Sequence, residues 1–230
     1  MAISLVAVGM RWGVDRAGEG AHPTAGAPFV AALSEAQWWD GEWRSLPATR
    51  IDMRGRELRP FDLQWAAPLD RVEAELAAAG WQALPPLQVA DTLRWLTQTS
   101  RVEELPVLPQ VHAGLHARLT LRRAVDEERQ YLIRLWDSGQ RVQTEQGVVP
   151  LWLGSLTEQR ARTYYRLFRY PVAEPGAPQI SPLPAPTPAT AIRRVHAGAH
   201  SLWLMGAPRN LYTSPLADAP EGAPTPLSPP

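Results

Sequence analysis

The amino-acid sequence predicts an α+β domain: a mostly antiparallel sheet with two or three helices packed on it, followed by a proline-rich linker and C-terminal tail. Three observations lead to this fold class. Short segments with the apolar patterns of strands outnumber segments with a helical period. Strands and helices do not alternate regularly, as they do in parallel α/β folds. Fourteen of the 24 prolines follow residue 170, and proline disfavours helices and interior strands.

The same proline distribution predicts how the chain is divided. Residues 1–27, rich in glycine and alanine, are expected to form a flexible N-terminal segment. Residues 28–206 are expected to form a single domain, interrupted by a proline-rich insertion at 171–190. Residues 207–230 are expected to be a disordered tail. The ordered part that remains, roughly 150 residues, has a typical single-domain size.

Helical patterns occur in three places. Between Pro68 and Gly80, a proline in the first turn, an apolar stripe and a closing glycine predict a helix. A shorter helix is expected from Pro28 to Trp39, with an Asp-Gly pair ending it. Another is expected over residues 88–98, with Leu93 and Leu96 facing inward.

Two short apolar segments, Tyr131–Trp136 and Leu151–Thr157, have the length and composition of buried strands. The turn residues between them, at 137–139 and 146–147, predict a β-hairpin at the centre of the sheet. Further strands are expected over residues 48–53, 58–65, 117–122, 163–170, 192–196 and 201–205.

The composition excludes several classes of function. Acidic and basic residues balance at 23 each, so no net charge favours nucleic acid as a partner. The basic residues are all arginines, and without lysine the chain cannot form a P-loop, a Schiff base or a kinase-type ATP site. The absence of cysteine excludes disulfides, thiolate catalysis and cysteine-ligated zinc. No cofactor is expected.

The sequence also indicates the relation of the chain to membranes. No segment reaches the ~18 consecutive apolar residues that a membrane-spanning helix needs. Ala2–Val8 is apolar but short, and it lacks the features of a secretory signal. It is either the remainder of a membrane helix or an unstructured start. We therefore expect no transmembrane helix in this chain and a position peripheral to the cell membrane.

Several short motifs follow one another along the chain in a characteristic order. These landmarks are Trp38-Trp39, Trp43, Leu46-Pro47, Arg50-Ile51-Asp52, Gln64-Trp65, Ala79-Gly80-Trp81, Leu105-Pro106, Leu108-Pro109, Ile133-Arg134-Leu135-Trp136 and Trp152-Leu-Gly-Ser155. The ordered set resembles the LssY C-terminal domain family. The resemblance covers roughly Trp38 to Thr157 and continues more weakly to Met205.

The resemblance implies a domain that is often fused behind multi-span membrane modules. Those modules are similar to lipid phosphatases of the type-2 phosphatidic-acid phosphatase superfamily or to DedA membrane proteins. The motifs of the phosphatase module require a lysine and a Ser-Gly-His, and this chain contains neither. The resemblance therefore implies a membrane protein or a lipid-linked ligand as the partner, and no phosphatase activity.

Two near-copies of a His-x-x-x-His spacing, Val111–His116 and Val195–His200, raise the possibility of zinc binding. That spacing places both imidazoles on one helix face, but glycine within each motif disfavours a helix by ~1 kcal/mol relative to alanine. The Ala-Gly pairs instead predict the tips of hairpins, with the histidines on either side. We expect no metal site.

Arg134 shares a predicted strand face with Leu132 and Trp136, because side chains alternate with a period of two. A guanidinium on an apolar face pairs with a carboxylate or binds an anion, and it can stack on Trp136 or Trp152. Trp38 and Trp39, close to Trp43, form either a membrane-interface belt or a cap on one end of the core. The residues that we expect to serve binding are Arg134, Trp136, Trp152, Trp38, Trp39 and His112.

No catalytic residue is predicted, because Ser155 follows Gly154 without the second glycine of a nucleophile elbow. The first hypothesis is a non-catalytic accessory or binding domain beside a membrane-embedded lipid or lipid-phosphate module. A second is a small hydrolase that uses His112 or His116 with a carboxylate. A third is an adaptor that presents Pro182–Pro188 to a partner as polyproline II.

Overall fold

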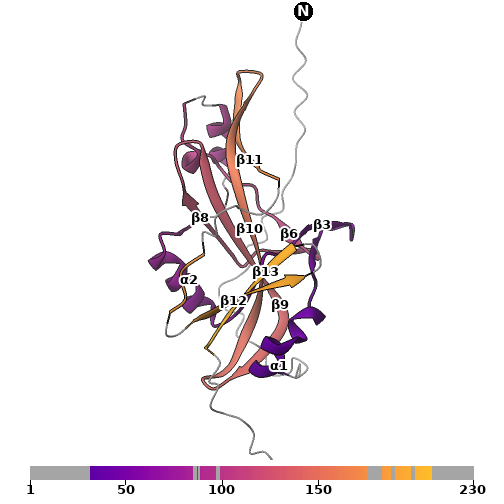
Figure 1. Cartoon of the computed structure of the whole chain (residues 1–230). Coiled ribbons are helices and arrows are strands. Elements are labelled where there is room, and N and C mark those ends of the chain that lie inside the picture. The colour runs from indigo at the N-terminus through magenta and orange to yellow at the C-terminus, as the bar shows by residue number, and fades with distance from the viewer. Residues whose placement is uncertain are drawn as a thin grey trace, which may run out of the picture. The chain divides into compact units, whose positions relative to one another are not determined.

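The computed structural model describes residues 32–84, 87, 89–96, 99–175, 183–187, 190–197 and 200–208. These residues form a mostly β structure built on one mixed sheet of nine strands (Figure 1). The strands of the sheet are β1 (Leu33–Ser34), β4 (Leu63–Ala66), β5 (Gln82–Ala83), β8 (Leu119–Ala124), β9 (Arg129–Thr144), β10 (Gly147–Tyr164), β11 (Phe168–Ala173), β12 (Ala191–Ala197) and β13 (His200–Gly206).

Smaller elements surround this sheet. Two strand pairs lie outside it: β2 (Thr49–Ile51) with β3 (Glu57–Pro60), and β6 (Val111–His112) with β7 (Leu115–His116). The helical elements of the described residues are α1 (Glu35–Asp40), α2 (Leu69–Ala78) and the 3₁₀ helices η1 (Glu42–Ser45), η2 (Val89–Leu96) and η3 (Val102–Glu104).

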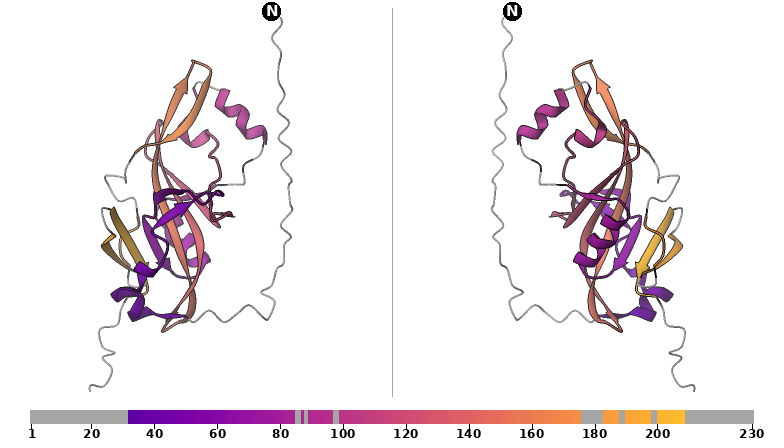
Figure 2. Two further views of the ribbon diagram at one scale, coloured as in Figure 1. Left: turned by 90° about the vertical axis from the view of Figure 1, so that its right-hand side faces the viewer. Right: turned by 90° about the vertical axis from the view of Figure 1, so that its left-hand side faces the viewer.

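The sheet combines antiparallel and parallel pairing. Its strand order is β12-β13-β4-β10-β9-β8-β5, while β11 pairs with β10 and β1 with β9 beyond this path. β13 lies parallel to β4, and β1 lies parallel to β9. The other pairs of the sheet are antiparallel. The long strands β9 and β10 therefore form the centre of the structure (Figures 1 and 2).

The central hairpin is confirmed: its turn lies at residues 145–146, at the second of the two expected turn positions, whereas the first, at 137–139, is not the turn. The two apolar segments pair directly, with Trp136 opposite Leu153 and Leu132 opposite Thr157. The polar residues at 137–139 do not end the strand: Asp137 accepts a hydrogen bond from the Gly139 N–H, and the register shifts between Pro150 and Trp152. The β-bulge accommodates the extra polar residues of β9 within its pairing with β10, so β9 continues to Thr144.

The predicted fold class, α+β with two or three helices packed on the sheet, is wrong. In the described residues the α-helices are short, with six residues in α1 and ten in α2. The strands are much longer than their apolar segments: β9 has 16 residues and β10 has 18. β9 and β10 pair the backbone N–H and C=O groups of one another, so their hydrogen-bonded pairing continues beyond the apolar residues.

The helix expected between Pro68 and Gly80 is confirmed as α2, and the Trp81 N–H closes its end by donating to the Leu76 carbonyl. The first helix begins later than expected, since Ser34 caps α1 and donates to and accepts from Gln37. The start expected at Pro28 lies outside the described residues.

The helix expected over residues 88–98 is a 3₁₀ helix, η2, and its orientation is opposite to the prediction. Leu93 and Leu96 are 65% and 53% exposed, so they face outward. Trp95 is the side chain that packs inward, against Val102, Leu105 and Ala161. A 3₁₀ helix has three residues per turn, so a stripe calculated for 3.6 residues per turn is displaced along it.

The core lies on both faces of the sheet. α2 covers the first face, where its Val72 and Leu76 pack with Ile133, Leu135 and Trp152. On the opposite face α1 and η1 contribute an indole cluster around Trp136. The members of this second cluster are Trp38, Trp39, Trp43, Leu46, Phe61, Ala66, Trp136, Val142, Leu151, Leu153, Val195, Leu202 and Leu204.

The remaining expectations concern the C-terminal hairpin, the proline-rich insertion, the terminal segments and the absence of a membrane-spanning helix. The hairpin expected from residues 192–196 and 201–205 is confirmed as β12–β13. β11 extends three residues into the expected insertion, 171–190, and Thr190 is buried. Residues 1–27 and 209–230 lie outside the described residues, so both terminal segments stay predictions. No helix in the described part of the chain is long and apolar enough to cross a bilayer.

Gly154 is the position where the centre of the sheet is packed most tightly. A Cβ atom there would lie 2.5 Å from Leu63 Cγ and 2.8 Å from Leu135 Cδ2. We expect Gly154→Ala to lower the free energy of unfolding by about 1–3 kcal/mol through overpacking, as measured by urea denaturation. Ser155→Ala is the control, because its buried hydroxyl has no partner among the described residues, and it should change stability by less than ~1 kcal/mol. Equal stabilities for wild type and Gly154→Ala would contradict this packing.

Asp62 makes stability depend on pH. Burial raises its pKa to about 6 from 3.8, although the Leu156 N–H donates to Oδ2 at 2.7 Å and opposes the shift. Because the folded state binds this proton more tightly than the unfolded state, the contribution of Asp62 to stability is largest below pH ~4 and is lost as pH rises through ~6. Asp62→Asn removes the titration and keeps an acceptor. The difference in free energy of unfolding between wild type and variant should change by about 2 kcal/mol between pH 4 and pH 7. Parallel pH profiles would contradict this assignment.

Candidate functional site

A cavity with a charged side chain in its wall lies on the sheet face opposite α2. Its volume is about 470 Å³. β9 and β10 form its floor, β11 forms one side, and η2 with the extended segment after η3 covers it. Its lining residues are Trp95, Pro106, Leu108, Gln110, Arg134, Gln159, Phe168, Tyr170, Pro171 and Ala173. We call it the Arg134 cavity.

Arg134 occupies the middle of the floor. It is 1% exposed, and the strand register places it directly between Thr120 of β8 and Ser155 of β10. Its Nη2 donates to the Leu108 carbonyl at 3.4 Å, a long contact. Its Nε and Nη1 have no hydrogen-bond partner among the described residues. Most of the donors of this guanidinium are therefore unsatisfied in an apolar setting.

Within the described residues, no carboxylate pairs with the charge of Arg134. None of the ion pairs in the described part of the chain includes Arg134. Burial lowers the pKa of Arg134 to about 10, and the positive charge of Arg50 contributes in the same direction. At neutral pH the side chain is still protonated, so a desolvated cation faces the cavity at considerable cost in free energy.

The floor beside Arg134 is polar as well. On the same face, Gln130 donates from Nε2 to Gln159 Oε1 at 3.0 Å, and both side chains are buried. Gln130 Oε1 and Ser155 Oγ have no partner within the described residues. Gln130 and Ser155 are not part of the cavity lining, so among the described lining residues the unpaired buried atoms belong to Arg134. Buried polar atoms are normally paired, so these donors point to a ligand that pairs with them.

The cover of the cavity follows from its proline-rich sequence. Pro106 and Pro109 lack an N–H, so residues 105–110 cannot join the sheet as an interior strand and instead cross over it. The Pro106 carbonyl accepts a hydrogen bond from Trp95 Nε1 at 3.2 Å. Arg122 of β8 donates to the Glu103 carbonyl. These contacts hold η2, η3 and the extended segment above the floor.

The structure brings some of the expected binding residues together and separates others. Arg134 and Trp136 share a face of β9, as expected, whereas Trp152 lies on the α2 face and donates from Nε1 to the Ala67 carbonyl at 2.8 Å. Arg50, not Arg134, lies over the Trp136 ring, 5.9 Å from its centroid. Trp152 is thus part of the first core cluster and does not contact the Arg134 cavity.

Trp38 and Trp39 are buried in the second core cluster, with ring centroids 4.7 Å apart. Trp38 donates from Nε1 to Gln64 Oε1 at 3.0 Å. Both indoles close over Gly206, where a Cβ would lie 2.9 Å from Trp38 Cζ3. Their position is that of a core cap, so any role in binding would require them to become exposed.

The histidines flank hairpin tips, as the sequence predicts. His112 and His116 lie on either side of the β6–β7 turn. His112 Nδ1 accepts a hydrogen bond from the Ile51 N–H at 3.3 Å, and its ring packs edge-on against Phe61 at 5.0 Å. Burial, with a contribution from Arg50, lowers the pKa of His112. This histidine is a neutral packing residue at neutral pH.

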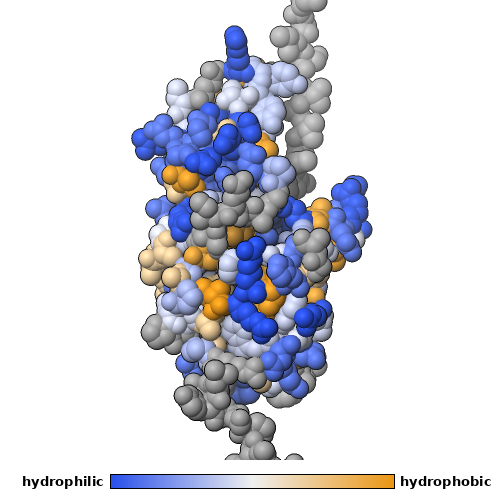
Figure 3. Space-filling model, viewed as in Figure 1, coloured by the Kyte–Doolittle hydropathy of each residue, from blue (hydrophilic) through white to orange (hydrophobic). Residues whose placement is uncertain are grey.

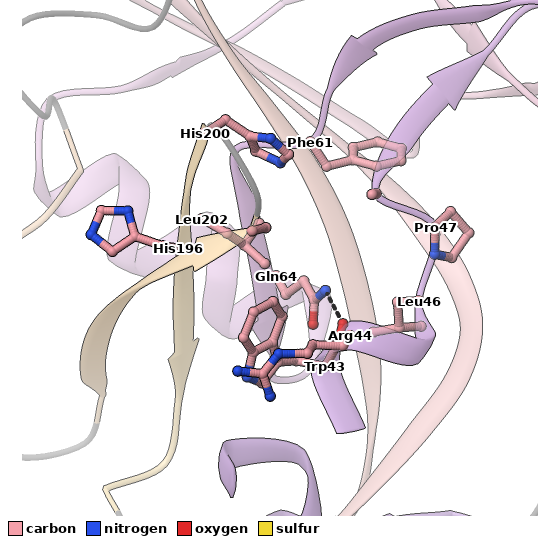
Figure 4. A pocket seen from close by; sticks show the side chains of 11 residues that line it. Trp43, Arg44, Leu46, Pro47, Phe61, Gln64, His196, His200 and Leu202 are labelled. Carbon is pink, nitrogen blue, oxygen red and sulfur yellow. Dashed lines mark hydrogen bonds between the residues drawn. The ribbon is translucent and has the colours of Figure 1, made fainter. Parts of the chain in front are cut away.

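A second cavity, of about 240 Å³, adjoins the β12–β13 hairpin (Figure 4). His196 and His200 line it, but their rings do not point toward one another. Gln64 is held in its wall by donating from Nε2 to the Trp43 carbonyl at 2.9 Å, and Arg44 lies 4.3 Å above the Trp43 ring. Its polar groups are therefore largely engaged with each other.

The contacts of the histidines do not assemble a catalytic pair. None of the ion pairs within the described ranges includes a histidine. The described residues contain no group of three or more His, Asp or Glu side chains that could hold a metal ion. The hydrolase alternative gains no support from these contacts.

Sequence reasoning identified Arg134 but missed most of the cavity. Phe168 and Tyr170 come from a segment predicted only as a strand, and Gln159 lies beyond the end of the strand predicted over residues 151–157. One signal was present: Ser155, Thr157 and Gln159 alternate with Leu156 in a strand whose centre is buried. Polar residues at that spacing indicate a polar face, and here this face is covered.

Comparison with known proteins identifies one relationship. The family model described as LssY C-terminus matches residues 43–167. The matched region includes Arg134 and every other residue of the cavity lining up to Gln159, and it ends at the tip of the β10–β11 hairpin. No curated protein and no solved structure matches the chain.

The unpaired charge of Arg134 predicts an unusual effect on stability. Arg134→Met keeps most of the side-chain volume and removes the desolvated cation. We expect it to raise the free energy of unfolding of the ligand-free protein by about 1–3 kcal/mol, as measured by urea denaturation. Arg160→Met, at an exposed position of β10, is the control and should change stability by less than ~1 kcal/mol. A loss of several kcal/mol at position 134 would instead identify a structural arginine.

Proposed function

Because the chain belongs to the LssY C-terminus family, whose model matches more than half of it, we propose that it is a non-catalytic binding domain. Its ligand is an amphiphile with one anionic group and one apolar chain, bound in the Arg134 cavity. The observation that carries this proposal is the buried, unpaired guanidinium in the floor of a mainly apolar cavity.

The anionic group follows from the unsatisfied donors. A carboxylate or phosphate oxygen at Nε and Nη1 of Arg134 forms charge-assisted hydrogen bonds in the paired geometry that guanidinium favours. Such a ligand also offsets the cost of burying the cation. The positive charge of Arg50, which opposes protonation of Arg134, adds to the attraction of an anion.

The apolar chain follows from the walls. Trp95, Leu108, Phe168 and Pro171 surround the space above the guanidinium. The volume of about 470 Å³ is within the range of ligand cavities, roughly 300–1,000 Å³. A small inorganic anion would leave these walls uncovered, whereas an acyl or alkyl chain would pack against them.

Binding, rather than bond breaking, fits the groups around the anion position. Ser155 lies directly opposite Arg134, and its Oγ has no general base bonded to it among the described residues. Nucleophilic catalysis needs such a base within hydrogen-bond reach. The groups present bind and orient a charge, which is the chemistry of an accessory domain.

A lipid or lipid-linked phosphate would combine the two parts of such a ligand. This chemistry agrees with the partner implied by the family, a membrane-embedded module that handles lipids. The adaptor alternative draws no support from the described part of its segment: Leu183 packs against the first core cluster, and the Thr187 N–H donates to the Thr190 carbonyl. Those contacts hold the segment on the domain.

Isothermal titration calorimetry of the full chain tests the proposal. Dodecyl phosphate and dodecanoate, both below their micellar concentrations, represent the phosphate and carboxylate sources of the anion. We expect Arg134→Gln to weaken binding of the preferred anion by about thirtyfold or more, because the loss of a buried charge-assisted contact costs ~2 kcal/mol or more. Arg160→Gln is the matched control and should bind as wild type does.

Dodecanol and dodecyltrimethylammonium distinguish the anion from the chain. Both carry the same apolar chain, and both should bind at least tenfold more weakly than the anionic ligands, since neither offers an acceptor charge to Arg134 (about 1.4 kcal/mol per tenfold change). Equal affinities for dodecanol and dodecyl phosphate, or an unchanged affinity in Arg134→Gln, would refute the proposed function.

A further inference from the structure

The end of the molecule formed by the β10–β11 hairpin exposes an unusual number of apolar side chains. Twelve large hydrophobic residues are exposed in the described part of the chain, and half of them lie here. Tyr165 at the hairpin tip is 89% exposed and Leu167 beside it is 58% exposed. The six residues of this surface, which we call the tip surface, are Leu93, Leu96, Tyr164, Tyr165, Leu167 and Phe168.

Two elements form the tip surface. β11 contacts η2, and the Arg169 Nε of β11 donates to the Ser100 carbonyl at 2.9 Å, four residues beyond η2. Both views in Figure 2 show the η2 helix beside the β11 hairpin at the same end of the sheet. The outward leucines of η2 and the aromatic residues of the hairpin therefore belong to one end of the molecule.

The turn at the tip is built from residues that do not favour its conformation. The Leu167 N–H donates to the Tyr164 carbonyl at 3.0 Å, and the two residues between them have positive φ, 52° at Tyr165 and 56° at Arg166. This is the two-residue hairpin turn that strongly prefers Asn-Gly. Large L-residues adopt this conformation at a cost in free energy that Asn-Gly avoids. A role for the side chains of Tyr165 and Arg166 themselves would account for this choice of residues.

The hairpin is also positively charged. Between Gln159 and Ala173 it carries four arginines and no acidic residue. Arg160 and Arg162 lie 3.8 and 3.0 Å from the Glu174 carboxylate, and Arg169 pairs with Glu128 at 2.7 Å, so two carboxylates face the charge of the four arginines. On the face shown in Figure 3, hydrophilic side chains gather over the upper end of β10 and β11, around a few hydrophobic ones.

We infer that the tip surface docks on an anionic phospholipid bilayer. Tyrosine and arginine at one exposed tip are the side chains that favour the membrane–water interface, and the positive charge complements anionic headgroups. A bilayer requires only that a few apolar side chains insert while nearby charges attract.

The docking surface adjoins the Arg134 cavity. Phe168 belongs to the tip surface and also lines the cavity, and Trp95 of η2 lines the cavity between the outward-facing Leu93 and Leu96. Docking would therefore bring the cavity wall to the headgroup region. The inference goes beyond the proposed function and is tested separately from it, because Tyr165 and Arg166 at the tip do not line the cavity.

Co-sedimentation of the full chain with vesicles tests the inference. One set of vesicles contains phosphatidylcholine alone, and the other contains phosphatidylcholine with phosphatidylglycerol. Wild type should sediment with the anionic vesicles, less so at high salt, and weakly with the neutral ones. The double variant Tyr165→Asn, Arg166→Gly replaces the tip by the preferred turn sequence, so it should fold with an unchanged or higher melting temperature.

The double variant should bind anionic vesicles about tenfold more weakly than wild type, because it loses one inserted ring and one cation. Met53→Ser is the matched control: Met53 is 80% exposed in the β2–β3 turn, and its replacement should leave vesicle binding unchanged. The double variant should bind dodecyl phosphate as wild type does, because Tyr165 and Arg166 do not line the Arg134 cavity, and this separates the inference from the proposed function.

Three results would overturn the inference. The first is equal sedimentation of wild type and the double variant with anionic vesicles. The second is no sedimentation of wild type with either vesicle type. The third is self-association of wild type without vesicles that the double variant abolishes, since the tip surface would then bind a second copy of the chain.

Discussion

Burial of β9 and β10 on both faces is the constraint on which the rest of the structure depends. Tyr131–Trp136 and most of Leu151–Thr157 are buried, although consecutive residues of a strand point to opposite sides. Each face therefore needs its own cover. α2 supplies one, while α1, η1 and the extended segment after η3 supply the other, and the position of every small element follows from this requirement.

The two faces are not equivalent. On the α2 face, Ile133 and Leu135 meet apolar partners throughout, and Gly154 lets Leu63 approach them. On the other face, the side chains change along β9 from Trp136 to Arg134 to Gln130. The change occurs where the cover passes from the indoles of α1 and η1 to the proline-rich segment. An incompletely filled space above polar side chains results, and this space is the Arg134 cavity.

The sequence predicts the elements whose determinants are local. The central strands, α2 with its closing Gly80, and the β12–β13 hairpin are confirmed because short apolar patterns and turn residues specify them. The 3₁₀ form of η2 and the extension of β9 through Asp137 depend on tertiary partners, so local patterns do not reveal them. The fold class was wrong for the same reason, since the ladder rather than the apolar pattern sets the strand lengths.

In the candidate site too, the sequence predicts what local patterns determine and does not predict what depends on tertiary contacts. Alternation correctly places Arg134 on the face of Trp136, but it cannot relate that face to the residues of another strand. The pairing register decides this: Ser155, not Trp152, lies on the face of Arg134. The walls from η2 and β11 lie far from Arg134 in the sequence, and no spacing rule connects them.

Arg134 and the Tyr165–Arg166 turn are the two places where the chain departs most clearly from local rules. One is a desolvated cation without a carboxylate among the described residues, and the other is a pair of large residues at positive φ. Departures of this kind tend to coincide with function, because selection for stability alone would remove them. Here one strand connects both: β11 begins at Phe168 beside the strained turn, and its Tyr170 and Pro171 line the cavity. A tip that docks and a cavity that binds would therefore share a structural element, so that a ligand entering from a bilayer would have only the length of this strand to travel.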